Sequence, residues 1–207
     1  MSEFDSKART WDHDPMKVDR ANEIAKVIVN TISVNNRMTG FEYGCGTGLL
    51  GLNLRYFFKK LVLADNSNEM LAVLKEKISE QGIKNIEPVF IDLEKEIPPP
   101  VQYDVVMAQL ALHHVQDYKT VLRHFYQMIL PGGYVCIADL EPEDGSFHGD
   151  GFLGHRGFDP VDMRNFLENI GFIDSNYKVV YTIKKQTSKG EKAFKVFLIT
   201  AKKPYLL

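Results

Sequence analysis

The sequence predicts an α/β fold, a doubly wound three-layer sandwich whose seven-stranded, mostly parallel sheet has a reversed C-terminal strand. Up to residue 169, short apolar runs of strand length alternate with segments whose apolar residues recur at helical spacing. Strands that alternate with helices form parallel sheets covered on both faces. The last two strand-like segments, 176–185 and 193–202, are joined by a loop too short to hold a crossover helix. These two strands must therefore be antiparallel, which reverses one strand of the sheet.

The first predicted element is a helix that precedes the first strand. It begins near Pro15 and fades before Asn35, and its apolar face consists of Val18, Ala21, Ile24, Ala25, Ile28 and Ile32. After the first strand and its glycine-rich turn, we expect helices at 49–58, 68–81, 118–129 and 160–169. The intervening strands are expected at 61–64, 86–91, 103–108 and 134–138, the last preceded by a turn at 131–133.

Length and composition are those of one globular domain, which we expect to span residues 1–207. The chain has 207 residues, of which 44% are hydrophobic and 25% charged. No apolar run approaches the roughly 18 residues that a membrane span requires. The first residues lack the basic-then-apolar pattern of a secretory signal. We therefore expect a cytoplasmic protein without membrane contact.

Charge is unevenly distributed along the chain. The net charge is −2, but residues 178–207 contain eight lysines and one glutamate, which leaves about −9 on the rest. A basic tail is compatible with nucleic-acid binding, but lysines also protect exposed edge strands from aggregation, and we favour that explanation. The two cysteines, Cys45 and Cys136, are too few for a disulfide framework or a zinc cluster, and we expect both to be buried thiols.

The segment 41–48, Phe-Glu-Tyr-Gly-Cys-Gly-Thr-Gly, carries the strongest functional signal. Glycines accept positive φ in a sharp strand-to-helix turn and allow a ligand to touch the backbone. The helix that follows directs free N–H groups and its positive dipole end at the turn, where polar or anionic ligand groups can bind. Glu42 adds an acceptor beside it. A turn that merely packs strand against helix is the alternative.

Two kinds of nucleotide cofactor fit this segment. Residues 46–51 also match the G-x-G-x-x-G pattern of dinucleotide-binding oxidoreductases, and Asp65 follows Gly46 by nineteen residues. In either case Asp65, at the end of the next strand, is expected to accept hydrogen bonds from ribose hydroxyls. The alternative is that residues 65–68 form a helix cap, in which Asp65 or Ser67 accepts hydrogen bonds from the free N–H groups.

An ordered set of motifs resembles the class I S-adenosylmethionine-dependent methyltransferases over nearly the whole chain. The set consists of Glu42-x-Gly44-x-Gly46-x-Gly48, Asp65, Phe90-Ile91-Asp92-Leu93, Ala111-Leu112-His113-His114-Val115 and Leu130-Pro131-Gly132-Gly133. That family has a reversed last strand, which agrees with the terminal hairpin inferred from loop length. The resemblance implies an N-terminal helical lid at 1–35, a cofactor-binding half at 36–140, and a substrate-side loop, helix and hairpin at 141–207.

The resemblance also implies roles for individual residues toward S-adenosylmethionine. Glu42 and the turn would hold its methionine part, and Asp65 its ribose. The turn residues concerned are Gly44, Cys45, Gly46 and Gly48. Around the adenosine the implied residues are Asn66, Met70, Asp92 and Leu93, with Asp92 accepting from the adenine amino group and Leu93 donating its backbone N–H. Gln109 would lie near the sulfonium. Loop capping is the alternative role of Asp92.

Acceptor-binding residues are expected in two places. His113 follows the fourth strand and is suited to act as a base near neutral pH, whereas His114 is expected to pack in the core. Residues 141–158 form a long irregular segment with five glycines, over the crevice where ligands of open α/β sheets bind. Within it, Arg156 is a candidate for binding an acidic group, and His148 or His155 for a base. We expect no metal site from His148 and His155, because no thiolate accompanies them.

The acceptor itself is expected to be a small molecule. The segment 154–160 resembles small-molecule methyltransferases of the ubiquinone-biosynthesis-like group, as do Phe4, Ala8, Trp11 and Asp12 of the leading segment. The Asn/Asp-Pro-Pro-Tyr sequence of enzymes that methylate nucleic-acid bases is missing after the fourth strand, and we expect no nucleic-acid partner. The alternatives are an NAD(P)-dependent oxidoreductase and a methyltransferase-like binding subunit without catalysis of its own.

Overall fold

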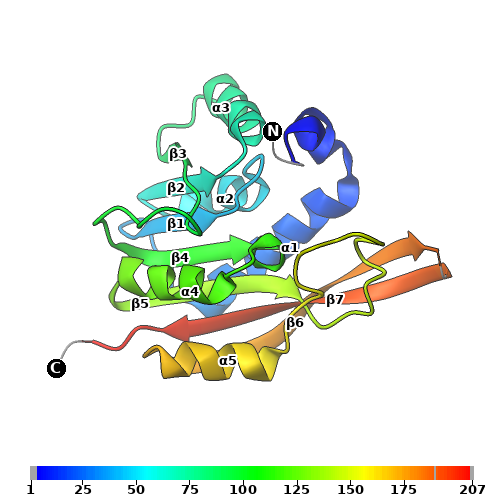
Figure 1. Ribbon diagram of the computed structural model, residues 1–207. Helices are drawn as coiled ribbons and strands as arrows, with labels where there is room; N and C mark the ends of the chain where they lie inside the picture. Colours follow the sequence, from blue (N-terminus) through cyan, green and yellow to red (C-terminus); the bar gives the residue numbers. More distant parts are fainter. Residues whose placement is uncertain (1–3, 189, 206–207) are drawn as a thin grey trace.

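The computed structural model describes residues 4–188 and 190–205 and has a seven-stranded sheet as its central layer (Figure 1). The strands are β1 (Thr39–Tyr43), β2 (Lys60–Asp65), β3 (Ile86–Phe90), β4 (Tyr103–Gln109), β5 (Ile129–Leu140), β6 (Ile173–Thr187) and β7 (Gly190–Lys202). Their order across the sheet is β3-β2-β1-β4-β5-β7-β6, and β1 to β5 are mutually parallel. From β1 the chain adds β2 and β3 on one side and then crosses to add β4 and β5 on the other. Open α/β sheets bind ligands at such a reversal of strand order, here between β1 and β4.

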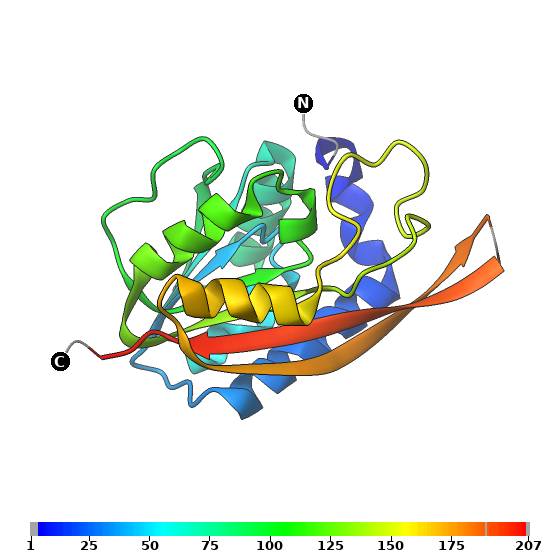
Figure 2. The same ribbon diagram turned by 60° about the horizontal axis from the view of Figure 1, so that its bottom comes forward.

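The reversed strand predicted from loop length is β7. It pairs antiparallel with β5 on one side and with β6 on the other. Figure 2 shows β6 and β7 running beyond the rest of the sheet as one long hairpin. The prediction of a mostly parallel sheet with one reversed C-terminal strand is therefore confirmed.

Helices cover both faces of the sheet, as predicted. The α-helices are α1 (Pro15–Thr31), α2 (Leu49–Leu54), α3 (Asn68–Glu80), α4 (Tyr118–Met128) and α5 (Pro160–Asn169). One apolar cluster joins α1, α2 and α3 to the sheet through residues such as Ile28, Leu54 and Leu74. The other joins α4 and α5 to the opposite face through Phe125 and Leu167. Figure 2 shows α4 and α5 on the near side of the sheet.

Three short 3-10 helices complete the fold: η1 (Asp5–His13), η2 (Arg55–Phe57) and η3 (Leu112–His114). Asp14 separates η1 from α1 and caps α1, its carboxylate accepting from Met16 N at 3.0 Å, and Pro15 takes the first helical position. In Figure 1, η1 and the loop after β5 lie at the same end of the sheet, beside the carboxyl ends of the parallel strands.

The boundaries of β5 differ from the prediction. We expected a turn at 131–133 and a strand from Tyr134, but β5 begins at Ile129 and ends at Leu140. The reason is tertiary: Gly132 N donates to Lys203 O at 2.9 Å, and Lys203 N donates to Gly133 O at 2.8 Å. The segment after β7 thus draws the glycine pair into the sheet.

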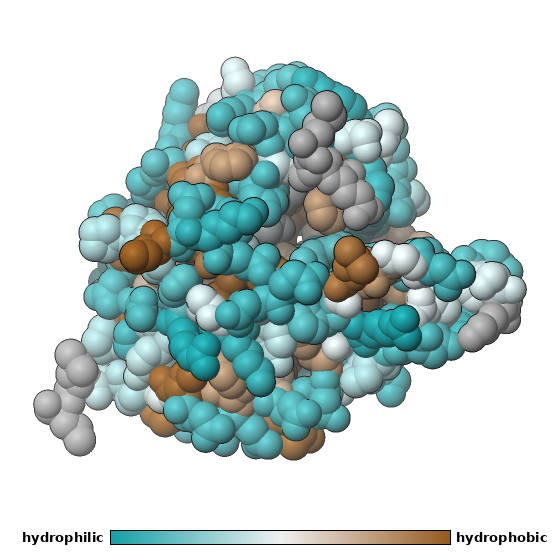
Figure 3. All heavy atoms as spheres, in the orientation of Figure 1, coloured by the Kyte–Doolittle hydropathy of each residue, from teal (hydrophilic) through white to brown (hydrophobic). Residues whose placement is uncertain are grey.

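Apolar residues on the face seen in Figure 3 are scattered among hydrophilic ones. Both cysteines are buried, as predicted, and burial raises the pKa of both thiols. Among the described residues, no helix has the length and apolar character needed to cross a membrane.

Candidate active site

A cavity of about 510 Å³ opens at the carboxyl ends of the central strands, at the switch point between β1 and β4. Its floor comes from the end of β1 and the glycine turn, the end of β2, and the end of β4 with η3. Its cover comes from η1 and from the loop after β5, through Phe4, Trp11, Phe147 and His148. Segments far apart in the sequence therefore enclose one space.

The glycine turn meets the backbone demands that the sequence suggested. Gly44 has a φ of +68°, and a Cβ there would lie 2.4 Å from the Cβ of Ala111. Gly46 has a φ of +54°, and a Cβ there would point toward Met70 Sδ and Trp11 Nε1, at 3.8 and 3.9 Å. The first glycine thus permits close packing, and the second leaves room beside the cavity lining.

Glu42 lies at the end of β1 with 2% of its surface exposed. It accepts a hydrogen bond from the Gly51 backbone N–H, whereas its Oε2 has no partner among the described residues. Burial raises the pKa of this carboxyl to about 8, the Gly51 bond opposes the rise, and the Asp65 charge adds to it. A cationic ligand group would favour the ionised form and supply the missing partner.

Asp65 is buried at the end of β2 and holds the glycine turn in place. Its Oδ2 accepts from Gly46 N at 2.7 Å, and its Oδ1 accepts from Ser67 N at 2.9 Å. Burial raises the pKa of its carboxyl against these bonds. The side-chain cap of α3 is Ser67, whose Oγ accepts from Met70 N at 3.2 Å. Asp65 lines the cavity, as do Asn66 and Met70.

Arg20 on α1 also lines the cavity, and the sequence analysis missed it. Its side chain is 8% exposed, and its Nε finds no partner within the part of the chain that the structure describes. Burial lowers the pKa of its guanidinium to about 10, partly offset by the charges of Asp14 and Asp139. A signal was present, because Arg20 precedes Ile24 and Ile28 at four-residue spacing and so shares their buried face. A buried guanidinium with a free donor is suited to an anionic ligand group.

The N-terminal segment is fastened to the glycine turn. Thr47 Oγ1 donates to Asp12 Oδ1 at 2.5 Å, Asp12 also pairs with Lys77 of α3, and Lys77 Nζ donates to Thr47 O at 2.8 Å. Farther along, Ser67 Oγ donates to Asp5 Oδ1 at 2.6 Å. These bonds hold η1 over the cavity, the position expected of a lid.

Of the two adjacent histidines of η3, His114 departs from the expected burial, whereas the expected role of His113 toward the acceptor stays a prediction. His113, expected to face the acceptor, is the buried one, with 2% exposure, whereas His114, expected in the core, is half-buried; both line the cavity. His113 Nδ1 lies 2.6 Å from Asp139 Oδ1 at the end of β5. Its Nε2 is buried and has no partner among the described residues. Asp139 was missed, although a carboxylate closing an apolar strand is the signal that identified Asp65.

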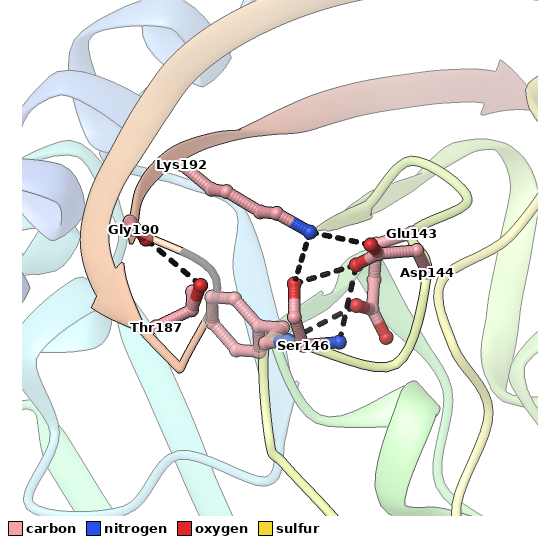
Figure 4. A network of polar contacts seen from close by, with 7 residues as sticks. Glu143, Asp144, Ser146, Thr187, Gly190 and Lys192 are labelled. Atoms are coloured by element: carbon pink, nitrogen blue, oxygen red, sulfur yellow. Dashed lines mark hydrogen bonds and ion pairs between the residues drawn. The ribbon is translucent and has the colours of Figure 1, made fainter.

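His148 reaches the cavity from a loop tied to the terminal hairpin. Figure 4 shows Lys192 of β7 between Asp144 and Ser146 of that loop. Lys192 pairs with Asp144 and also donates to Ser146 Oγ at 3.1 Å, and Lys185 donates to Phe147 O. The Lys192 bond, with help from Ser146, lowers the pKa of the Asp144 carboxyl. These bonds position Phe147 and His148 at the cavity.

Five of the predicted site residues lie outside the cavity lining: Gly48, Asp92, Leu93, His155 and Arg156. Gly48 is needed for packing, because a Cβ there would lie 2.5 Å from Leu74 Cδ1. Asp92 has the alternative role foreseen for it: its Oδ1 accepts from Glu94 N at 3.1 Å, and its Oδ2 pairs with Lys95 at 2.7 Å. Glu94, two residues on, lines the cavity instead.

Each of the other three has a partner elsewhere. The Leu93 backbone N–H bonds the Tyr43 hydroxyl. His155 Nε2 lies 3.2 Å from Gln116 O, and its ring packs on Tyr118. The guanidinium of Arg156 packs against Gly145, where a Cβ would lie 2.9 Å from its Cζ.

Unpartnered polar atoms concentrate at this cavity. The described part of the chain has four buried side-chain polar atoms without a hydrogen-bond partner: Arg20 Nε, Glu42 Oε2, Gln109 Oε1 and His113 Nε2. All four residues line the cavity. Because a buried polar group without a partner costs about 1–3 kcal/mol, their convergence indicates a site built for a polar ligand.

Comparison with known proteins shows similarity to methyltransferases. A family model described as a methyltransferase domain matches residues 41–133, from the glycine turn to the glycine pair of β5. An uncharacterised methyltransferase of Schizosaccharomyces pombe is 26% identical over 85% of this chain and 69% of its own length. These similarities support a class I S-adenosylmethionine-dependent methyltransferase.

Two further comparisons agree, one in sequence and one in fold. The ubiquinone biosynthesis O-methyltransferase of Pseudomonas savastanoi is 29% identical over 68% of this chain, which spans 62% of that protein. A chain of the Haloferax volcanii complex between the Trm112 methyltransferase activator and a methyltransferase has the same fold, with a TM-score of 0.77 and 16% identity over 99% of both chains. Of the two nucleotide cofactors that the glycine pattern allowed, S-adenosylmethionine is the one that the family uses.

Proposed function

We propose that this methyltransferase transfers a methyl group from S-adenosylmethionine to a small molecule bound under η1 and the loop after β5. The observation that carries the proposal is the convergence of four unpartnered buried polar atoms on one cavity. Two of these atoms belong to a carboxyl group, Glu42, and a guanidinium group, Arg20. The other two belong to the amide of Gln109 and the imidazole of His113. The ammonium and carboxylate groups of an amino-acid moiety would pair with Glu42 and Arg20, and a neutral acceptor would hydrogen-bond to Gln109 and His113.

At the cofactor end, the charges match the methionine part of S-adenosylmethionine. Glu42 would receive its ammonium group and Arg20 its carboxylate, which satisfies both Oε2 and Nε. Asp65 would accept hydrogen bonds from the ribose hydroxyls, beside Asn66 and Met70. When bound, the cofactor supplies a methyl group made electrophilic by the adjoining sulfonium.

At the acceptor end, Gln109 Oε1 and His113 Nε2 present lone pairs to the cavity. Asp139 fixes His113 with Nδ1 as the donor, so Nε2 is free to accept a hydrogen bond from an acceptor hydroxyl or amine. Such bonds orient the acceptor lone pair toward the methyl group, and orientation supplies much of the rate of a bimolecular transfer.

A small, ring-bearing acceptor fits this end of the cavity better than a polymer. Aromatic rings of Phe4, Trp11 and Phe147 line it beside the histidines, and η1 and the loop cover it. A cavity of about 510 Å³ is of the size that small-molecule ligands use. The name of the Pseudomonas relative, an O-methyltransferase of ubiquinone biosynthesis, points to the same acceptor class.

The first test is calorimetric titration with S-adenosylhomocysteine. Asp65→Ala should weaken binding about 10- to 100-fold, because a charge-assisted hydrogen bond contributes about 1.5–3 kcal/mol. The matched control is Glu80→Ala, which removes an exposed carboxylate at the far end of α3. Absence of binding to the wild-type protein at millimolar concentration would refute the proposal.

The second test is turnover of ring hydroxyls and ring amines, followed by release of S-adenosylhomocysteine. Turnover by the chain alone is the expected result. Cofactor binding without turnover across the panel would instead favour a binding subunit, or an enzyme that requires an activator such as the one in the Haloferax complex.

A further inference from the structure

Three histidine side chains meet at the acceptor end of the cavity. His113 and His114 come from η3, and His148 comes from the loop after β5. The ring centroids lie 4.2 Å apart for His113 and His114, 5.1 Å for His113 and His148, and 5.0 Å for His114 and His148. One ring nitrogen from each lies within 4.8 Å of the others. No local pattern indicates this cluster, because 33 residues separate His114 from His148.

His113 is already oriented as a metal ligand. Its Nδ1 lies 2.6 Å from Oδ1 of Asp139, which is fully buried and also accepts from Leu140 N at 2.8 Å. The carboxylate therefore holds the proton on Nδ1 and leaves a lone pair on Nε2, which has no partner within the described residues. Metal-binding histidines usually have such a carboxylate on the second ring nitrogen, because it fixes the tautomer and the ring orientation.

His148 is the exposed member of the cluster and comes from a loop. Its ring stacks on Phe152 at 3.8 Å and 15°, and the Asp144–Lys192 pair anchors its loop to the hairpin (Figure 4). The side chain itself is exposed. Tetrahedral zinc with Zn–N bonds of about 2.0–2.1 Å needs nitrogens about 3.4 Å apart. The three nitrogens, within 4.8 Å of one another, must therefore approach by up to about 1.4 Å on binding the ion, and His148 is the exposed member of the set.

We propose that His113, His114 and His148 bind one divalent transition-metal ion, with zinc as the best match. Imidazole nitrogen is a preferred ligand of zinc, and three protein ligands leave a fourth tetrahedral position. With the ion bound, that fourth position takes over from His113 Nε2 the contact with an acceptor hydroxyl or a water. A metal-bound hydroxyl loses its proton to solvent far more readily than a free one. This last role rests on the proposed methyl transfer, whereas metal binding does not.

The test is titration of the untagged, chelator-treated protein with cobalt(II) and then zinc. We expect one cobalt(II) ion per chain, the visible absorption of a four- or five-coordinate site, and its displacement by zinc. His148→Ala should abolish the absorption, and Asp139→Asn should weaken zinc binding about 10- to 100-fold by freeing the His113 ring. The control is His13→Ala, which removes an exposed histidine of η1 and should bind as the wild type does.

Titration of each variant with S-adenosylhomocysteine keeps the result interpretable. His148 is an exposed loop residue, so the His148→Ala protein should retain cofactor binding, which shows that it is folded. The inference is overturned if the wild type binds neither metal at a concentration up to about 1 mM, or if His148→Ala binds both as tightly as the wild type. Loss of cofactor binding in the wild type would refute the proposed function and leave the metal result standing.

Discussion

Replacement of Glu42 by glutamine gives a pH-dependent prediction that the structure makes quantitative. Burial raises the pKa of the Glu42 carboxyl from 4.5 to about 8 in the folded protein. The groups that face it are the Gly51 N–H, the Asp65 carboxylate and the Cys45 thiol. Between these two pH values the unfolded chain loses the proton and the folded chain keeps it. The stability that Glu42 contributes is therefore complete below pH 4.5 and is lost as pH rises through about 8.

The size of the effect follows from the same shift. One pH unit corresponds to about 1.4 kcal/mol, so a rise from 4.5 to about 8 gives an upper limit of about 5 kcal/mol. Glutamine at this position has nearly the same shape and no proton to lose. Glu42→Gln should therefore come within about 1 kcal/mol of the wild type near pH 5 and exceed it by several kcal/mol near pH 8.5.

Urea unfolding of both proteins at pH 5, 7 and 8.5, without cofactor, measures the difference. Calorimetry adds a second readout. Because the proposed ammonium partner favours the ionised carboxylate, binding of S-adenosylhomocysteine at pH 7 should release a proton from the wild type and none from Glu42→Gln. Parallel pH profiles for the two proteins would refute the reasoning about Glu42.

Three further substitutions test the site. Gly44→Ala should lower the free energy of unfolding by more than the strain of about 1–2 kcal/mol expected for a non-glycine residue at positive φ, and it should abolish cofactor binding. The control is Gly82→Ala, at a φ of +61° with open space around it, which should lose only the strain energy. Equal losses in urea unfolding would contradict this. Arg20→Met should stabilise the protein at pH 7 by up to about 3 kcal/mol, since burial lowers the pKa of its guanidinium to about 10. It should also weaken S-adenosylhomocysteine binding while leaving 5′-methylthioadenosine, which lacks the carboxylate, unaffected; an equal effect on both ligands would remove Arg20 from the carboxylate site. Lys192→Gln should speed amide hydrogen exchange at residues 143–147, because it breaks the pair with Asp144; unchanged exchange would show that the hairpin does not hold the loop.

The order and type of the elements could be predicted because they depend on local spacing. Apolar periodicity located α1, α3 and α5, and the short terminal loop determined the reversal of β7. The start of β5 could not be predicted in this way. It depends on the pairing of Gly132 and Gly133 with Lys203, about seventy residues away, and no local pattern of glycine and proline contains that information.

The same division applies to the site. The backbone conformation at Gly44 and Gly46 follows from residue type alone, since both occupy the left-handed region. The contribution of Arg20 depends on the packing of α1 beside the sheet. The partial exposure of His114, which was expected in the core, depends on how η3 turns after β4. Residue type identifies both histidines as candidates, but only the folded path of the chain decides which imidazole ring lies against Asp139.

The anchoring of η1 has a consequence for biosynthesis. The segment Asp5–His13 is translated before its side-chain partners Thr47, Ser67 and Lys77, which all come later in the chain. During synthesis on the ribosome, η1 therefore lacks this full set of side-chain partners until α3 has emerged. The cover of the cavity is thus translated ahead of the side chains that fasten it.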